Sequence, residues 1–277
     1  MRRPAQGQHT TLRLPQRLLR RAHSYRSGVR FLGQYLYAVT RSLSLLTGGL
    51  VSPDGRRRIR ELATALGYGP RPRLPYVALK ALVGPEVSIR VLEADISEWN
   101  VRLVDLVAIN SIVARCAPQT AFEIGTGDGL TALNMAGNMP DGGRLHTLNL
   151  PPDRAGLPNE QKVGERFQGV PLEEKIVQLY GDSMSYDFAR FHGAMDLVFV
   201  DGNHRAEAVA NDTGAALRMV RGPGSVILWH DYGFRRGVTE IVDRLRERFS
   251  REGRLVAIQG TWIACLILGS DVPKLPG

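Results

Sequence analysis

Cysteine is scarce in this 277-residue sequence, and an apolar segment long enough to span a membrane is missing from its amino-terminal part. Cys116 and Cys265 are far apart and lack a C-x-x-C partner, which excludes a disulfide framework and a zinc knuckle and favours a reducing, intracellular environment. Segment 29–46 has helical spacing but is too polar to cross a bilayer, and arginines interrupt the apolar run that a secretory signal needs. The expected location is therefore cytoplasmic.

Acidic residues are almost missing from the first 60 positions, which hold thirteen arginines and one acid, Asp54. The whole chain has a formal net charge of +9, so the excess positive charge belongs to this segment. Such a segment suits an anionic membrane surface, at which the protein would be peripheral, or an acidic protein partner. A solvated, partly helical extension that packs on the domain explains it equally well. Nucleic acid is disfavoured because few aromatic residues are interleaved with the basic ones.

Glycine and proline interrupt the chain up to residue 75, and strand-like and helix-like segments alternate after it. We therefore predict a basic N-terminal helical extension and linker at 1–75 and one folded domain at 76–277. An amphipathic helix starts near Val101. The periodicity predicts strands at 121–124, 144–150, 175–180, 197–200 and 225–229, and helices at 130–138, 206–220 and 237–249.

This alternation predicts an α/β fold of the Rossmann-like, doubly wound kind, in which helices cover both faces of a mostly parallel sheet. The carboxyl-terminal part differs, because segments 254–259 and 261–268 read as two strands joined at Gly260. Such a tight connection predicts an antiparallel hairpin at the end of the sheet.

A glycine-rich turn follows the first strand, in Glu123-Ile-Gly-Thr-Gly-Asp-Gly129. Gly125 and Gly127 allow a tight turn close to a ligand, and Gly129 opens the next helix. The spacing G-x-G-x-G, with an acid before it, differs from the G-x-G-x-x-G that serves a pyrophosphate, so an NAD-dependent oxidoreductase is disfavoured. A tight turn that binds nothing is the simpler alternative.

Several motifs together resemble a known family. Ala121-Phe-Glu-Ile-Gly-Thr-Gly-Asp-Gly-Leu-Thr131 is similar to motif I of class I S-adenosylmethionine-dependent methyltransferases. The resemblance covers about residues 99–270 and includes Gly181-Asp-Ser183, Asp201-Gly-Asn-His204 and His230-Asp-Tyr232. This combination most resembles bacterial methyltransferases of the family-24 kind, which are related to metal-assisted O-methyltransferases.

The resemblance implies that S-adenosylmethionine is the cofactor. The residues that it assigns to cofactor binding are Glu123, Gly125, Thr126, Gly127, Gly129, Asn149, Asp182, Ser183 and Asp201. The family has an acid at the end of the second strand for the two ribose hydroxyls, where this chain has Asn149. An amide cannot accept two hydroxyl protons as a carboxylate does, so weaker binding or a different ribose geometry is expected. Asp182 matches the position that contacts the adenine amino group.

Candidate residues for the reaction follow two further strands, Asp201 and His204 after one and His230 and Asp231 after the other. The ends of neighbouring parallel strands lie side by side, so we expect these four residues to meet. The resemblance implies that Asp201 and Asp231, with His230 as a third ligand, bind a divalent ion such as Mg²⁺ or Mn²⁺ that activates the acceptor oxygen. Without a metal, His204 or His230 is the catalytic base, assisted by Asp201 or Asp231.

The sequence thus predicts an enzyme that methylates the hydroxyl of a small molecule or glycan with S-adenosylmethionine. N-methylation stays open, although the Asn/Asp-Pro-Pro-aromatic signature is missing. The arginine-rich segment motivates two alternatives, an RNA-directed methyltransferase and a non-catalytic protein of a membrane surface. Loop 151–171 and the region before Val101 are expected to wall the acceptor pocket, with Trp99 and Phe234 as lesser candidates. Homodimers are common among such enzymes, but the sequence contains no heptad or patch that indicates one.

Overall fold

A computed structural model describes residues 69–94, 100–157, 162–249 and 253–269, together with scattered positions between 36 and 63. Internal contacts divide the chain into two units, Met1–Ile59 and Arg60–Gly277. Most of the predicted basic extension lies outside the described residues; Tyr37 and Leu43, which are described, are helical and exposed. In the part of the chain that is described, no helix has the length and apolar character that a membrane crossing needs.

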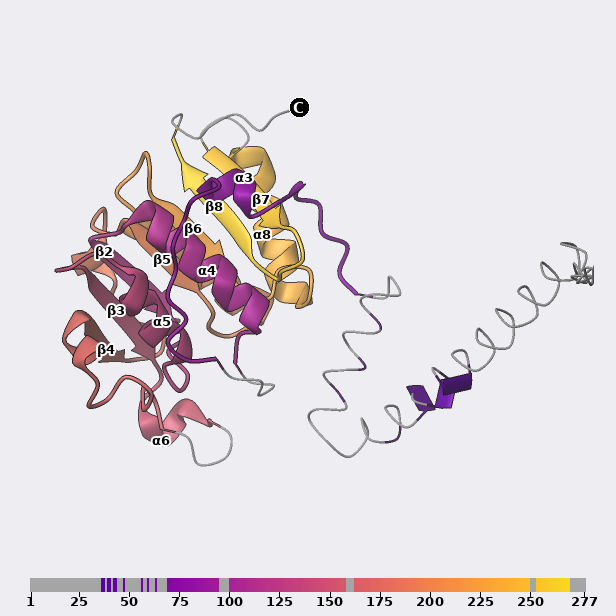
Figure 1. Cartoon of the computed structure of the whole chain (residues 1–277), viewed down its shortest axis with the longest axis horizontal. Helices are drawn as coiled ribbons and strands as arrows, with labels where there is room; N and C mark the ends of the chain where they lie inside the picture. Colours follow the sequence, from indigo (N-terminus) through magenta and orange to yellow (C-terminus); the bar gives the residue numbers. More distant parts are fainter. Residues whose placement is uncertain are drawn as a thin grey trace, which may run out of the picture. The chain divides into compact units, whose positions relative to one another are not determined.

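A twisted eight-stranded sheet forms the centre of the second unit, in the order β1-β7-β8-β6-β5-β2-β3-β4 (Figure 1). The strands are β1 (Tyr76–Val77), β2 (Thr120–Ile124), β3 (Arg144–Asn149), β4 (Ile176–Tyr180), β5 (Leu197–Val200), β6 (Val226–Trp229), β7 (Gly253–Ile258) and β8 (Ala264–Leu268). Strand β8 runs antiparallel to β6 and β7, whereas the other neighbours are parallel. The predicted mostly parallel sheet with a terminal antiparallel hairpin is confirmed.

Helices pack on both faces of this sheet (Figure 1). They are α3 (Lys80–Val83), α4 (Leu103–Cys116), α5 (Leu130–Asn138), α6 (Pro152–Ala155), α7 (Ala206–Met219) and α8 (Arg236–Arg248), with short 3-10 turns at Pro171–Lys175 and Ala189–Phe191. Alternate strand residues serve opposite faces, because side chains along a strand point to opposite sides. Ala121 belongs to the core beneath α4 and α5, and its neighbour Phe122 to the core beneath α7 and α8. The doubly wound architecture is thereby confirmed.

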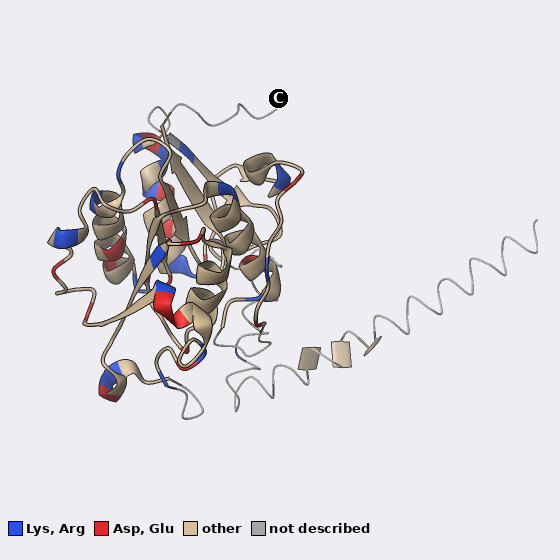
Figure 2. Cartoon of the chain, turned by 60° about the vertical axis from the view of Figure 1, so that its left-hand side comes forward, with Lys and Arg blue, Asp and Glu red and all other residues tan. Residues whose placement is uncertain are grey.

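The predicted helices and strands agree with the structure to within one or two residues at most ends. Helix α4 ends where Ala117 takes a left-handed conformation (φ 45°) before Pro118, which cannot continue a helix. Basic and acidic residues are interspersed over the second unit (Figure 2), so the excess positive charge of the chain is not a property of this unit.

Strand β1 was not predicted, because two residues carry no readable periodicity. Tyr76 and Val77 pair in parallel with Ala257 and Ile258 of β7, at the edge of the sheet. The segment before β1 is fixed by Tyr232, whose buried hydroxyl accepts the backbone N–H groups of Arg73 (3.1 Å) and Leu74 (3.0 Å). The same hydroxyl donates to Asp243 Oδ1 (2.6 Å). One phenol therefore joins the edge of the sheet to α8.

We expect Tyr232→Phe to lower the free energy of unfolding by about 1–3 kcal/mol, because three hydrogen bonds at one buried hydroxyl are lost while the ring is kept. Urea denaturation followed by circular dichroism measures the change. Tyr186→Phe is the matched control, because its hydroxyl accepts one exposed bond from Arg190, and it should cost less than about 0.5 kcal/mol. Equal losses in the two variants would contradict this account of Tyr232.

Candidate active site

A cleft of about 450 Å³ opens at the carboxyl ends of the parallel strands. The chain proceeds from β2 to β3 and β4 on one side and returns to β5 and β6 on the other, and ligand sites of open α/β sheets lie at such reversals. The lining residues are Asn100, Val101, Ile124, Gly125, Thr126, Gly127, Thr131, Leu148, Asn149, Leu150, Ala155, Gly181, Asp182, Ser183, Met184, Asp201, Gly202, Asn203, His204 and Ala208.

The two glycines of the loop after β2 have different physical roles. Gly125 (φ 107°) lies so close to the next strand end that an added Cβ would overlap the backbone oxygen of Asp201. The Asp201 N–H donates to Ile124 O (2.9 Å), which fixes this approach. Gly127 (φ 56°) has open space where a Cβ would lie. Gly125 is therefore required by packing, whereas Gly127 leaves one wall of the cleft free of side chain.

Glu123 lies beneath this loop and is fully buried. A chain of hydrogen bonds reaches it: Gln178 Nε2 donates to Thr126 Oγ1 (3.1 Å), Thr126 and Thr147 share a bond (2.7 Å), and Thr147 Oγ1 donates to Glu123 Oε2 (2.5 Å). The other carboxyl oxygen, Oε1, is buried without a hydrogen-bond partner. Burial raises the pKa of Glu123 to about 8 despite the bond from Thr147, and the charges of Asp201 and Asp128 add to the rise.

The polar residues at the ends of β3 and β4 already have hydrogen-bond or ion-pair partners within the protein. Asn149 Oδ1 accepts the Gly127 N–H (3.2 Å), so its amide supports the glycine loop. Asp182 Oδ1 accepts the Met184 N–H (3.1 Å), and its other oxygen lies 3.6 Å from Arg154 of α6. Ser183 is held through its carbonyl oxygen, which accepts from Asn211 Nδ2 (2.8 Å).

Most of the residues predicted to bind the cofactor line this one cleft: Gly125, Thr126, Gly127, Asn149, Asp182, Ser183 and Asp201. Glu123 and Gly129 do not line it. Glu123 is connected to the loop through its hydrogen bond from Thr147. Gly129 (φ 94°) precedes α5 and packs against the ring of Phe167. A role in cofactor binding stays a prediction for each of these residues.

The structure brings the four predicted reaction residues together at the ends of β5 and β6. His204 lines the cleft, and its Nε2 lies 3.0 Å from Asp231 Oδ2 and 3.9 Å from Asp201 Oδ1. His230 lies behind them with 9% of its side chain exposed, and its Nδ1 is 3.1 Å from Asp201 Oδ1. Asp201 and His204 therefore face the cleft, whereas His230 and Asp231 support them.

Three residues of this network, Arg102, Asp105 and Arg235, were not predicted from the sequence. Asp105 of α4 is fully buried and accepts both Nε and Nη2 of Arg102 (2.7 and 2.9 Å), and its Oδ2 lies 3.5 Å from His230 Nε2. Arg235 Nε donates to Asp231 Oδ2 (3.2 Å). The only local signal was the i, i+3 spacing of Arg102 and Asp105, which is common on ordinary helix surfaces.

The charges of the network decide its protonation. Burial alone would lower the pKa of His204, but hydrogen bonds and charges from Asp201 and Asp231 outweigh burial and raise the pKa to about 9. The pKa of His230 is likewise well above its ordinary value, because Asp201, Asp231 and Asp105 outweigh the burial that would lower it. Burial would raise the pKa of Asp231, yet His230, His204 and Arg235 hold it far below its usual range. The same carboxylates therefore favour the protonated form of both histidines.

The predicted metal ligands Asp201, Asp231 and His230 do not fit a divalent metal site. Asp231 lies between His204 and Arg235, and Asp201 is bonded to His230. Imidazolium and guanidinium groups thus supply the positive charge that a metal would bring. Within the described ranges, no group of three or more His, Cys, Asp or Glu side chains could hold a metal ion.

Two predicted wall residues have different outcomes. Phe234 is 7% exposed and stacks on Trp262, with ring centroids 3.9 Å apart, while the Arg102 guanidinium covers Trp262 from 3.5 Å. Phe234 is therefore packed beside the reaction residues and does not line the cleft. Trp99 lies outside the described residues.

Replacing Glu123 by Gln tests its protonation. The carboxyl titrates near 4.5 when unfolded and near 8 when folded, so the folded state binds more protons in between and stability falls as the pH rises through this range. We expect the difference in free energy of unfolding, Glu123→Gln minus wild type, to increase by up to about 1.4 kcal/mol for each unit that the pH rises between 5 and 8. Urea unfolding at four pH values measures the difference.

The histidines titrate in both proteins, so their contribution cancels in this comparison. Glu174→Gln makes the same substitution at an exposed glutamate and should not show this gain with pH. Parallel stability profiles of Glu123→Gln and wild type would show that Glu123 is ionised in the folded state.

Residues 122–232 match the family model of a methyltransferase domain, Methyltransf_24. The fold is similar to the O-methyltransferase TomG of Streptomyces achromogenes, which is involved in tomaymycin synthesis and was solved with S-adenosylmethionine: 16% identity, 62% of this chain, 83% of that chain and a TM-score of 0.50. It is also similar to the methyltransferase PaMTH1 of Podospora anserina, solved with S-adenosylhomocysteine: 14% identity, 62% of this chain, 81% of that chain and a TM-score of 0.50. A search of curated proteins gave no match.

Proposed function

We propose that this chain, which carries a class I methyltransferase domain of the family-24 type, transfers a methyl group from S-adenosylmethionine to a hydroxyl oxygen of a small molecule or glycan. The observation that carries the proposal is one cleft in which the glycine loop after β2 meets Asp201 and His204 after β5. When bound, the cofactor supplies a methyl group on a sulfonium, which is a good leaving group.

The residues present fit this cofactor. Gly127 leaves open space on the wall of the cleft, so a ligand can approach the backbone closely. Asp182 and Asp201 place two carboxylates along the same cleft, which suits a ligand that carries an ammonium and a sulfonium. Asn149 offers its amide where a ribose would need acceptors, although its Oδ1 already accepts the Gly127 N–H.

His204 is the residue that we assign to proton removal. Its Nε2–H donates to Asp231 (3.0 Å), which leaves Nδ1 of the neutral ring to accept the proton of the acceptor hydroxyl. Because the pKa of His204 is about 9, only about one molecule in a hundred has the neutral ring at pH 7. Asp201 Oδ1 lies 3.9 Å from the same Nε2 and is itself held by His230 Nδ1 (3.1 Å).

The His–Asp pair favours oxygen over nitrogen as the methylated atom. A hydroxyl must lose its proton for its oxygen to attack well, whereas a neutral amine attacks with its lone pair before it loses a proton. A cleft wall that presents the His204 imidazole and the Asp201 carboxylate, with Asp231 behind the imidazole, is therefore more useful to an O-methyltransferase. The RNA-directed and membrane-surface alternatives rest on residues 1–60, most of which lie outside the described part of the chain.

Calorimetric titration of S-adenosylmethionine into the purified full chain tests the cofactor. We expect saturable binding that is lost in Gly127→Arg, because the new side chain would start from a residue that lines the cleft, and that does not change when Mg²⁺ or Mn²⁺ is added or removed with EDTA. Gly142→Arg is the matched control: Gly142 also has positive φ and open space around a Cβ, but it lies outside the cleft. Absence of binding to the wild type, with or without metal, would refute the proposal.

The pH dependence of turnover tests His204, with an acceptor found by screening phenols, catechols and glycans for S-adenosylhomocysteine release. We expect kcat to rise about tenfold per pH unit up to about pH 9 and then level off, since the neutral imidazole is the active form. His204→Asn should lower kcat by about 10²–10⁴-fold and leave cofactor affinity within about threefold. His192→Asn, at an exposed histidine outside the cleft, should change neither. A flat profile between pH 7 and 9 would assign the proton to another group.

A further inference from the structure

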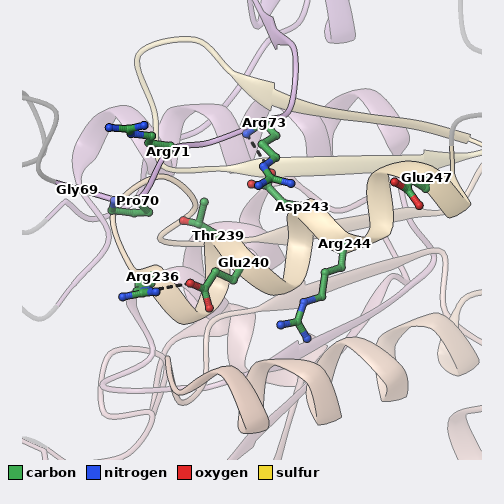
Figure 3. Close-up of a pocket in the computed structure, with 10 residues that line it drawn as sticks. All are labelled: Gly69, Pro70, Arg71, Arg73, Arg236, Thr239, Glu240, Asp243, Arg244 and Glu247. Atoms are coloured by element: carbon green, nitrogen blue, oxygen red, sulfur yellow. Dashed lines mark hydrogen bonds and ion pairs between the residues drawn. The ribbon is translucent and has the colours of Figure 1, made fainter.

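A second hollow, of about 720 Å³, is larger than the cleft and lies away from it. It is formed between segment 69–73 and one face of α8 (Figure 3). Segment 69–73 contributes Arg71 and Arg73, and α8 contributes Arg236, Glu240 and Arg244, which are spaced i, i+4, i+8 and so share one face of the helix. We call this hollow the arginine pocket. No aromatic or large aliphatic side chain lines it.

The acids of the arginine pocket are already engaged. Glu240 Oε1 accepts from Arg236 Nε (2.6 Å), and Asp243 Oδ1 accepts from the Tyr232 hydroxyl and from the backbone N–H of Arg73. Glu247 also has an interaction of its own. The acceptor groups of the pocket are thus largely taken by donors of the protein.

The guanidinium groups are in a different situation. Among the described residues, no ion pair joins Arg71, Arg73 or Arg244 to a carboxylate. Each guanidinium carries five N–H donors in a planar fork that suits phosphate oxygens. The pocket therefore has a surplus of charged donors over acceptors, and the ligand that complements it is anionic and rich in acceptors.

We propose that the arginine pocket binds a phosphate group, carried either by a soluble phosphate compound or by a lipid headgroup. Phosphate fits better than a single carboxylate, because the open donors come from two sides of the pocket, Arg71 and Arg73 from the segment and Arg244 from the helix. This proposal does not depend on the methyltransferase reaction.

Inorganic pyrophosphate, titrated calorimetrically into the full chain at 150 mM salt, tests the pocket. We expect saturable binding that weakens at least tenfold in Arg71→Gln/Arg73→Gln. The control Arg246→Gln/Arg248→Gln removes the same charge from exposed positions of α8 that do not line the pocket, and its affinity should stay within twofold of the wild type. Because both double variants lose two charges, binding that follows net charge alone falls equally in both.

Flotation with phosphatidylcholine vesicles, with and without phosphatidic acid, distinguishes the two sources of phosphate. Binding to phosphatidic acid vesicles that depends on Arg71 and Arg73 but not on Arg246 and Arg248, without binding of pyrophosphate, supports the lipid headgroup as the source. Pyrophosphate binding with the same dependence supports a soluble ligand. Equal losses in both double variants, or no binding to either probe, would overturn the proposal. Each result is obtained without S-adenosylmethionine and so is independent of the proposed function.

Discussion

The parallel contact between the ends of β2 and β5 is the constraint on which the site depends. The strands pair up to Ile124 and Val200, and the backbone then continues as Gly125 against Asp201, so close that no Cβ fits between them. This approach holds the glycine loop and the first reaction residue at a fixed separation. Glu123 is the residue of β2 that precedes Ile124, and its side chain is fully buried beneath the glycine loop.

Compensation of buried charge organises the other half of the site. Three carboxylates, Asp105, Asp201 and Asp231, lie 3.5, 3.1 and 3.8 Å from the ring nitrogens of the buried His230. Such charges would be costly to bury without partners. Two histidines and the guanidinium groups of Arg102 and Arg235 balance them. The net charge of the network is thus set by protein groups, and the carboxylates raise the pKa of both histidines above its ordinary value.

The sequence was sufficient for the fold and for the location of the cleft, because both follow from local patterns. Alternating strands and helices and the glycine spacing after β2 can be read in consecutive residues. The support for the site could not be read in this way. Asp105 and His230 are 125 positions apart, and only the tertiary fold brings the residue of α4 and the residue after β6 together. The surroundings of the predicted metal ligands could not be read in this way either, since the partners of Asp231 include Arg235, which no family motif marks.

The loop after β6 is bonded to residues of the cleft and to residues of the arginine pocket. Asp231 holds His204 at the cleft, and the next residue, Tyr232, bonds Asp243 of the arginine pocket, while the Gly233 N–H donates to Thr239, which also lines that pocket. Three consecutive residues therefore contact residues that line two separate hollows. Because buried hydrogen bonds are costly to leave unmade, a shift of Asp243 or Thr239 must be accommodated in this loop. His204 and α8 are thus joined through the hydrogen bonds and ion pair of this one loop.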